Sequence, residues 1–342
     1  MTQTSVHAQI PSDPADPADL ADRSDLSRNP DPRYNKLVVG TAPDSWGVWF
    51  PSDDRQIDWE TTLDEMAQAG YKYVETGPFG YFPTDSTRLR EEMSKRGLTV
   101  VAGTQFGILH KEGAWANTEY QMRRNAVVLK EVGAKFLVYL PPLFRSDKTW
   151  ELTEERVLSD QQWKLYAENA NRLGKILKDE YGITMVVHPH GDSHIETRAD
   201  IDRFFADTDP QYVSFCLDTG HIVYGGEDPI NIVRDYPERI GYVHIKAMDP
   251  DLVRQAHEQD WPFGEAIARG ASVTPPAGQP AMLALVEALA GLDREIIVVV
   301  EQDLYPVKFD FPLPNAIATR EYLAECNLGA RADLKPTTAK EG

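Results

Sequence analysis

The chain has 342 residues, 42% of them hydrophobic and 26% charged, which is the composition of an ordinary folded protein. Its formal net charge of −19 argues against nucleic acid or an anionic membrane as the main partner, because binding to phosphate groups needs a basic surface. No apolar run reaches the ~20 residues of a membrane span, and the polar start shows no secretory signal. Since Cys216 and Cys326 are the only cysteines, we expect a cytoplasmic protein.

Both ends of the chain are predicted to be tails. Residues 1–33 are rich in proline and aspartate and hold few large apolar side chains, which favours a disordered, acidic leader. The alternative is an arm that wraps a partner subunit. Residues 329–342 are predicted to be a flexible C-terminal tail, so that residues 34–328 form one catalytic domain.

Between the tails, apolar runs typical of buried strands alternate with segments of helical spacing. The predicted strands are residues 36–41, 71–76, 98–103, 135–140, 183–188, 213–218, 240–246 and 295–301. The predicted helices are residues 59–70, 86–97, 117–133, 159–181, 198–206, 229–236, 281–291 and 315–326. Strands that alternate with helices in this way predict an α/β protein with a parallel sheet, here a (β/α)8 TIM barrel. A doubly wound sheet is less favoured, because no GxGxxG follows the first strand.

One connection is too long for an ordinary loop. Residues 249–280 separate the seventh strand from the next helix, and their first part has helical spacing. We therefore predict an inserted helical lid between strand 7 and helix 7 of the barrel.

Four successive strands end in side chains that commonly bind metals: His188, Asp218, His244 and Glu301. In a barrel of this type the chemistry lies at the C-terminal ends of the strands, so these four side chains are expected to converge. Two imidazoles and two carboxylates suit Mn²⁺, with Co²⁺, Fe²⁺, Zn²⁺ or Mg²⁺ as alternatives. A polar cluster that binds sugar without a metal is the other interpretation.

Further candidates lie near the same strand ends. His190 lies two residues past His188 and is expected to face the same side of the chain. It is either a second metal ligand, a base or a hydrogen-bond donor to the substrate. Trp46 and Trp49 are either a stacking platform for a sugar ring or an aromatic group, or simple packing at the rim.

The segment 183–303 resembles a known family. Its motifs HPH, LDTGH, GYVHIK and VVVEQD are similar to those of inosose dehydratases, in the xylose isomerase-like superfamily of sugar isomerases and epimerases. The resemblance implies metal binding by His188, Asp218, His244 and Glu301. Many members of the superfamily have glutamate in place of His188, and its absence here weakens a two-glutamate epimerase mechanism.

The N-terminal motif departs from the dehydratase pattern. GTAPDSWGVWFP resembles instead the large subunit of metal-dependent C-glycoside deglycosidases, which act on 3-oxo-glycosides and pair with a small β-rich subunit. This second resemblance implies a small β-rich partner subunit; a homo-oligomer is the alternative.

Together these resemblances imply a lyase that binds a keto-sugar, removes the proton α to its carbonyl and expels a β leaving group. A 3-oxo-glycoside is the favoured substrate, keto-inositol (inosose) the second, and a sugar isomerase or epimerase the alternative function. The implied base is His190 or His110, with Glu301 as a further possibility. The implied proton donor to the carbonyl or enolate oxygen is Lys246, and Glu75 and Gln302 are expected to bind ring hydroxyls.

Overall fold

A computed structural model describes residues 29–146 and 148–329. Its strands form a closed barrel in the order β1-β10-β7-β6-β5-β4-β3-β2, and every neighbouring pair is parallel. The barrel strands are β1 (Leu37–Thr41), β2 (Tyr73–Pro78), β3 (Thr99–Phe106), β4 (Phe136–Leu140), β5 (Thr184–Val187), β6 (Val213–Asp218), β7 (Ile240–Ile245) and β10 (Ile296–Val300). The predicted (β/α)8 barrel is thereby confirmed.

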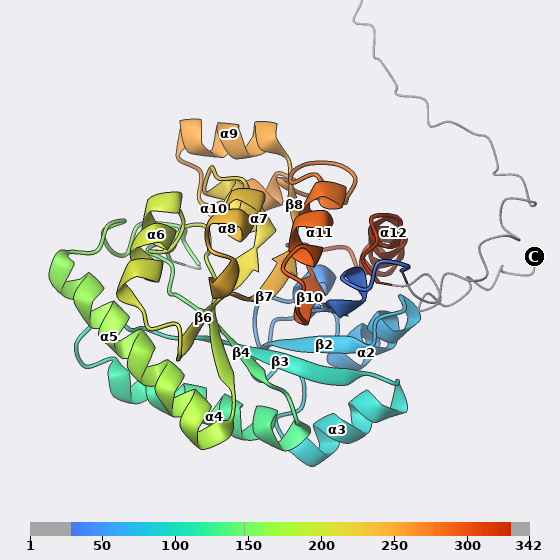
Figure 1. Ribbon diagram of the computed structural model, residues 1–342, viewed down its shortest axis with the longest axis horizontal. Coiled ribbons are helices and arrows are strands. Elements are labelled where there is room, and N and C mark those ends of the chain that lie inside the picture. Colours follow the sequence, from blue (N-terminus) through green and yellow to red (C-terminus); the bar gives the residue numbers. More distant parts are fainter. Residues whose placement is uncertain (1–28, 147, 330–342) are drawn as a thin grey trace, which may run out of the picture.

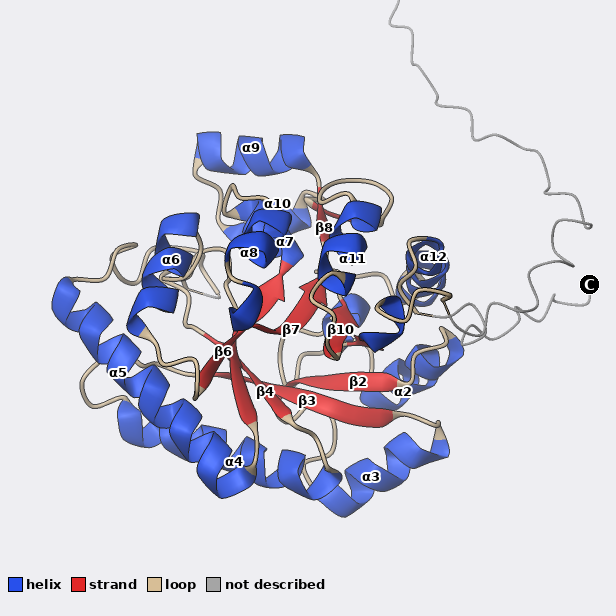
Figure 2. Ribbon diagram, viewed as in Figure 1, coloured by secondary structure: helices blue, strands red, loops and turns tan. Residues whose placement is uncertain are grey.

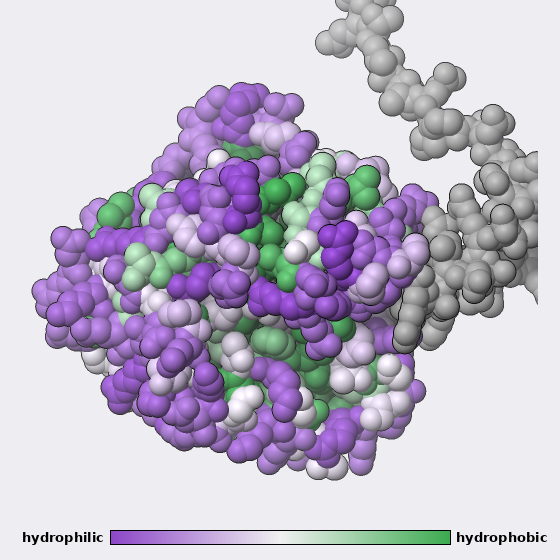
Figure 3. Space-filling model, in the orientation of Figure 1, coloured by the Kyte–Doolittle hydropathy of each residue, from purple (hydrophilic) through white to green (hydrophobic). Residues whose placement is uncertain are grey.

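Helices surround the barrel, as Figures 1 and 2 show. They are α2 (Trp59–Gln68), α3 (Ser86–Lys95), α4 (Trp115–Val132), α5 (Asp160–Ile176), α6 (Arg198–Asp207), α8 (Pro229–Asp235), α11 (Met282–Ala290) and α12 (Pro312–Glu325). Several begin at the capping residues that the sequence offers. Ser159 caps α5 and Thr197 caps α6, each in a capping box. The face of the molecule seen in Figure 3 is mostly hydrophilic, with apolar side chains towards its centre.

The strands bury side chains on both faces, as expected for a parallel barrel. Most of them pack outward against the helices in one large cluster. A small second cluster contains one or two residues from each of several strands, among them Val186, Cys216, Tyr242 and Val299. Because side chains alternate along a strand, this small cluster fills the barrel interior.

The long connection after β7 contains two helices, α9 (Pro250–Gln259) and α10 (Phe263–Ala268). It also contains β9 (Ser272–Val273), which pairs with β8 (Ala247–Met248) as a two-stranded antiparallel sheet. Figure 1 shows α9 at the outer end of this insertion. The expected helical insertion is therefore present; its action as a lid stays a prediction.

Polar contacts fasten the insertion to the loops that follow β4 and β5. The buried guanidinium of Arg145 lies 3.2 Å from Asp192 and 3.0 Å from Asp260. The backbone N–H of Phe263 donates to the other carboxylate oxygen of Asp192 at 2.6 Å. These contacts hold the start of α10 in a fixed place over the barrel.

Two local differences from the sequence prediction have simple causes. The motif that follows Asp218 forms a short helix, α7 (Thr219–Tyr224), because the Asp218 carboxylate caps it by accepting from the N–H of His221. The last turn of the predicted helix 159–181 is a π-helical segment, Leu177–Tyr181, which continues α5.

The predicted tails lie largely outside the described residues; of residues 1–33 only 29–33 are described, and of 329–342 only Gly329. Within the described ranges, every helix is too short or too polar to cross a membrane.

Gly174 provides a test of the packing between α5 and the barrel. Alanine is favoured over glycine in a helix by about 1 kcal/mol. A Cβ at Gly174, however, would lie 2.3 Å from the backbone oxygen of Tyr212, just before β6. We therefore expect Gly174→Ala to lower the free energy of unfolding by about 1–3 kcal/mol. Urea unfolding measures this, with Glu168→Ala on the exposed face of α5 as the control. A stabilised Gly174→Ala protein would contradict this packing.

Candidate active site

The four predicted ligands meet at one end of the barrel. His188, Asp218, His244 and Glu301 are all buried, and each offers a donor atom within 4.8 Å of the others. Each lies two residues beyond a member of the interior cluster, so the alternation along the strands turns all four inward. The apolar interior of the barrel thus lies directly beneath these four side chains.

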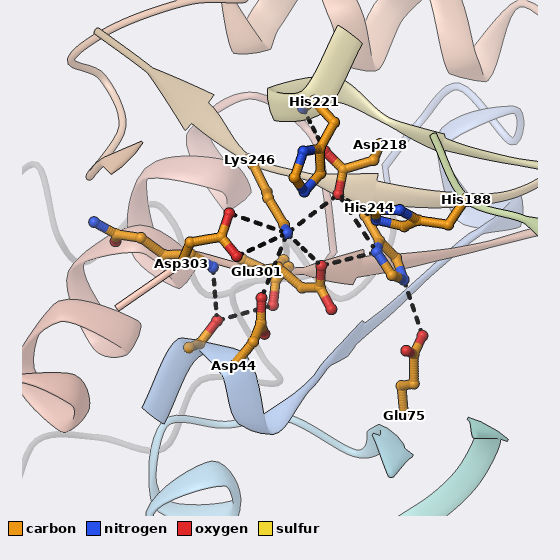
Figure 4. Close-up of polar contacts among 12 residues, drawn as sticks. Asp44, Glu75, His188, Asp218, His221, His244, Lys246, Glu301 and Asp303 are labelled. Atoms are coloured by element: carbon orange, nitrogen blue, oxygen red, sulfur yellow. Dashed lines mark hydrogen bonds and ion pairs between the residues drawn. The ribbon is translucent and has the colours of Figure 1, made fainter. Parts of the chain in front are cut away.

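Figure 4 shows His244 between carboxylates. Its Nε2 lies 2.9 Å from Glu75, while its Nδ1 lies 2.8 Å from Glu301 and 3.5 Å from Asp218. Burial alone would lower the pKa of His244, but the negative groups around it raise that pKa well above its ordinary value. The cluster therefore favours a positive charge at this position.

Lys246 extends the same network. Its buried ammonium lies 3.1 Å from Glu301, 3.3 Å from Asp218, 3.2 Å from Asp303 and 3.6 Å from Asp44. Burial would raise the pKa of Glu301, but His244 and Lys246 lower it to about 2. Glu301 is thus an ionised carboxylate at neutral pH.

The donor set fits a divalent cation. Nδ1 of His188 is buried and lacks a hydrogen-bond partner among the described residues, and Nδ1 of His244 faces the carboxylates of Glu301 and Asp218. Glu75 holds Nε2 of His244, and Thr104 donates to the other oxygen of Glu75. A carboxylate that fixes the far nitrogen of a ligating histidine is a common second layer of metal sites. The imidazole nitrogens and carboxylate oxygens of this cluster converge on one place, and together they provide the nitrogen and oxygen ligands of a divalent cation.

A cavity of about 620 Å³ opens over this cluster. His188, His244, Lys246 and Glu301 line it, together with His190 and Glu75. Much of its remaining wall is aromatic: Trp49, Phe50, Phe79, Phe106, Trp150 and Phe263. Its volume is within the range of ~300–1,000 Å³ that is common for drug-sized ligands. The cavity thus joins a charged floor to an apolar wall.

His190 lies at the cavity with a defined tautomer. Its Nδ1 is 2.7 Å from the carbonyl oxygen of Gly191, which can only accept, so Nδ1 carries the proton. Burial, aided by the nearby His188, lowers the pKa of His190 to about 3. At neutral pH the ring is therefore uncharged, and Nε2 can accept a proton.

The structure places three predicted residues away from the cavity. Trp46 is fully buried in the outer core, where its indole donates to Glu65 at 2.8 Å, so it is no stacking platform. Gln302 faces Asn315 of α12, which donates to it at 2.7 Å, so it does not meet ring hydroxyls. His110 does not line the cavity and lies 3.0 Å from Glu154, a position that does not suit a base for the substrate.

Glu75 does line the cavity, but both of its carboxylate oxygens have partners within the protein, Thr104 and His244. Its contacts make it a positioning residue for His244 rather than a free acceptor for ring hydroxyls. Trp49 lines the cavity as predicted and stacks on Tyr305, with ring centroids 5.1 Å apart.

Sequence reasoning missed Asp44, Trp150 and Phe263, which all line the cavity. Asp44 follows β1 as the other polar residues follow their strands, so the same rule applied to the first strand finds it. Burial and the nearby Glu301 raise the pKa of Asp44 well above its ordinary value, which favours a neutral carboxyl group. Trp150 lies in an irregular segment after β4, and Phe263 begins the short helix α10 of the insertion, so neither follows the end of a barrel strand.

Lys246→Met tests the charge balance of the floor. Removal of the ammonium leaves the buried carboxylates without their cation, so we expect the free energy of unfolding of the chelator-treated protein to fall by about 3–5 kcal/mol at pH 7. Lys246 helps to depress the pKa of Glu301 from 4.5 to about 2, a stabilisation that is present above pH 4.5 and lost as the pH falls. The difference between the two proteins should therefore shrink from pH 4.5 towards pH 2. Urea unfolding across this range measures it, and a difference independent of pH would contradict the assignment.

Curated relatives include the inosose dehydratase of Geobacillus thermodenitrificans, 31% identical over 301 residues, which cover 86% of this chain and 99% of that protein. The inosose dehydratase of Lacticaseibacillus casei is 30% identical over 296 residues, or 84% of this chain and 96% of that protein.

Solved structures with the same fold include the IolI protein with a bound zinc atom, at a TM-score of 0.66 and 16% identity over 85% of this chain and 98% of that one. The 3-keto-D-glucoside 4-epimerase YcjR of E. coli aligns at a TM-score of 0.61 and 18% identity, over 85% of this chain and all of that one. At these identities the likeness concerns the fold alone. The family model of the xylose isomerase-like TIM barrel matches residues 63–274. The chain belongs to the xylose isomerase-like TIM barrel family.

Proposed function

We propose that this protein is a divalent-metal-dependent lyase that acts on a ketone-bearing sugar and that favours a 3-oxo-glycoside with an apolar substituent. The observation that carries the proposal is the joining of a four-donor cluster to an aromatic cavity of about 620 Å³. The dehydratases among its relatives support elimination as the class of reaction.

The cluster of His188, Asp218, His244 and Glu301 would hold the cation. When bound, a divalent cation supplies a Lewis acid that polarises a ketone and acidifies the adjacent C–H. Mn²⁺ is the favoured ion, with Co²⁺, Fe²⁺, Zn²⁺ and Mg²⁺ as alternatives for a mixed nitrogen and oxygen set.

His190 is the proposed base. A histidine whose pKa is about 3 is weak, so it removes a proton efficiently only from a carbon that has been strongly acidified. At neutral pH such a base stays unprotonated, so its Nε2 remains able to accept the proton of the substrate. Its fixed Nδ1–H bond to Gly191 turns Nε2, the accepting atom, to one defined direction.

Lys246 and Asp44 are the proposed donors. The Lys246 ammonium can donate to the oxygen on which negative charge develops after the α-proton is removed. Asp44, whose pKa is raised by burial, is the candidate that returns a proton to the departing group. Neither oxygen of Asp44 has a hydrogen-bond partner among the described residues, so its carboxyl group is available to a ligand.

The cavity wall supports a substituent on the sugar. Trp49, Phe106 and Trp150 offer aromatic surface on which an apolar substituent of the sugar could pack. Dehydration of a keto-inositol is the second candidate, which the inosose dehydratases at 30–31% identity favour. A small β-rich partner subunit, or a second copy of this chain, is the proposed assembly partner, and the proposed location is the cytoplasm.

A panel of substrates in D₂O tests the reaction. The Mn²⁺-loaded protein is offered keto-inositol, 3-oxo-glycosides with O- and C-linked aromatic groups, and simple ketoses, with and without chelator. Mass spectrometry should show chelator-sensitive release of the aromatic group. Release of water from keto-inositol alone would favour the second candidate, and interconversion without any fragment would favour an isomerase or epimerase.

Replacement of Asp218 by alanine should abolish metal retention and activity together, because its carboxylate lies between both histidines and Lys246. Metal content after desalting is the measurement, and Asp228→Ala, at the start of α8, is the control. Full metal occupancy in the Asp218→Ala protein would overturn the assignment of the ligands.

His190→Gln should keep the metal but slow proton abstraction. Glutamine preserves a polar side chain of similar reach but cannot accept the proton, so a loss in kcat of about 100- to 10,000-fold is expected. Deuterium uptake at the carbon next to the ketone, measured with excess substrate, reports the step directly. An unchanged rate of uptake would leave His190 a structural role only.

A further inference from the structure

A second group of metal-binding side chains lies outside the cavity. His110 follows β3, Glu154 lies between β4 and α5, and His194 follows β5. They offer one donor atom each, all within 4.8 Å of one another, and share no residue with the His188 cluster. We infer that His110, Glu154 and His194 form a second cation site, with the chemistry of a zinc site.

The distances suit one shared ion. Nε2 of His110 lies 3.0 Å from one oxygen of Glu154, and Nε2 of His194 lies 3.6 Å from the other. Donors bound to one Zn²⁺ at ~2.0–2.2 Å lie no more than about 4.4 Å apart. Two imidazoles and one carboxylate, with a fourth position left for water, are a frequent zinc set.

His194 provides an independent observation. Its Nδ1 lies 3.1 Å from the carbonyl oxygen of Arg156, which can only accept, so Nδ1 carries the proton. In the neutral ring Nε2 then presents a lone pair towards the carboxylate of Glu154. The side chain is only 2% exposed, and Nε2 has no hydrogen-bond partner among the described residues. A cation between the two groups would turn this repulsion into attraction.

The charges agree with this geometry. Burial lowers the pKa of His110, which keeps its imidazole neutral. Burial would raise the pKa of Glu154, but hydrogen bonds from Lys111 and His110 lower it, so the carboxylate is ionised. The half-exposed ammonium of Lys111, 2.9 Å from Glu154, is the group that competes with a metal ion for this carboxylate.

The position of the site suggests its use. The segments that carry the three ligands also carry Phe106, Trp150 and His190, which line the cavity. A cation bound to His110, Glu154 and His194 would tie the loops after β3, β4 and β5 together. A cation at this site would therefore brace one wall of the cavity from outside, because none of its three ligands lines the cavity.

Zinc counting tests the inference. The untagged, full-length protein is stripped with chelator, loaded with Zn²⁺, desalted and analysed for metal per chain. Glu154→Gln and His194→Gln should each lose one equivalent relative to wild type, whether or not the His188 cluster is occupied. Asp218→Ala should retain that equivalent, which separates this test from the test of the proposed function. Glu155→Gln, an exposed neighbour, is the matched control.

Lys111→Met gives a readout that a purely structural ion pair would not move. Without the competing ammonium, Zn²⁺ should bind this site more tightly, and the rise in melting temperature on addition of Zn²⁺ should exceed that of wild type. Circular dichroism of each variant verifies folding. If wild type and Glu154→Gln retain equal zinc, and Lys111→Met shows no tighter binding, the cluster holds a proton in place of a metal ion and the inference is wrong.

Discussion

The alternation of side chains along the barrel strands is the constraint on which the site depends. Val186, Cys216, Tyr242 and Val299 fill the barrel interior. Two residues further along each strand the side chain points inward again, but now at the open end. His188, Asp218, His244 and Glu301 occupy these positions. A shift of one residue in any strand would turn its ligand outward into the helices, so the apolar interior and the polar cluster must be specified together.

The cost of this arrangement is a concentration of negative charge in a buried place. Asp44, Asp218, Glu301 and Asp303 all surround one ammonium, that of Lys246. Such a group of carboxylates is stable only when protons or cations balance it. The raised pKa of His244 is a consequence of this negative charge, whereas the depressed pKa of Glu301 reflects the nearby positive groups His244 and Lys246. A divalent cation would balance the negative charge of these carboxylates without added protons. The charge distribution alone therefore indicates a cation site at this end of the barrel.

The ligands could be predicted from sequence because strand ends are easy to locate and the barrel rule says which end matters. The inward position of Lys246 follows from the same alternation, because it lies two residues past His244. Gln302 could have been excluded by it, since Glu301 faces inward and the next residue turns towards α12. Trp46 could not, because it lies in a 3-10 turn, Pro43–Trp46, where period-two alternation no longer holds. His110 lies beyond the end of β3, where backbone geometry is set by tertiary contacts that no local pattern encodes.

The strands of the barrel and the loops that follow them determine different parts of the cavity. The metal-binding cluster at the base of the cavity comes from the ends of regular strands. The wall comes from the segments after β1, β3 and β4 and from the insertion, which supply Trp49, Phe106, Trp150 and Phe263. In the proposed reaction, activation of the ketone would need only the cluster at the base of the cavity, whereas the choice of leaving group would depend on what the wall can hold. Identity to the dehydratases therefore bears on the reaction class more than on the substrate, and the aromatic wall is the feature that argues for a larger, partly apolar molecule.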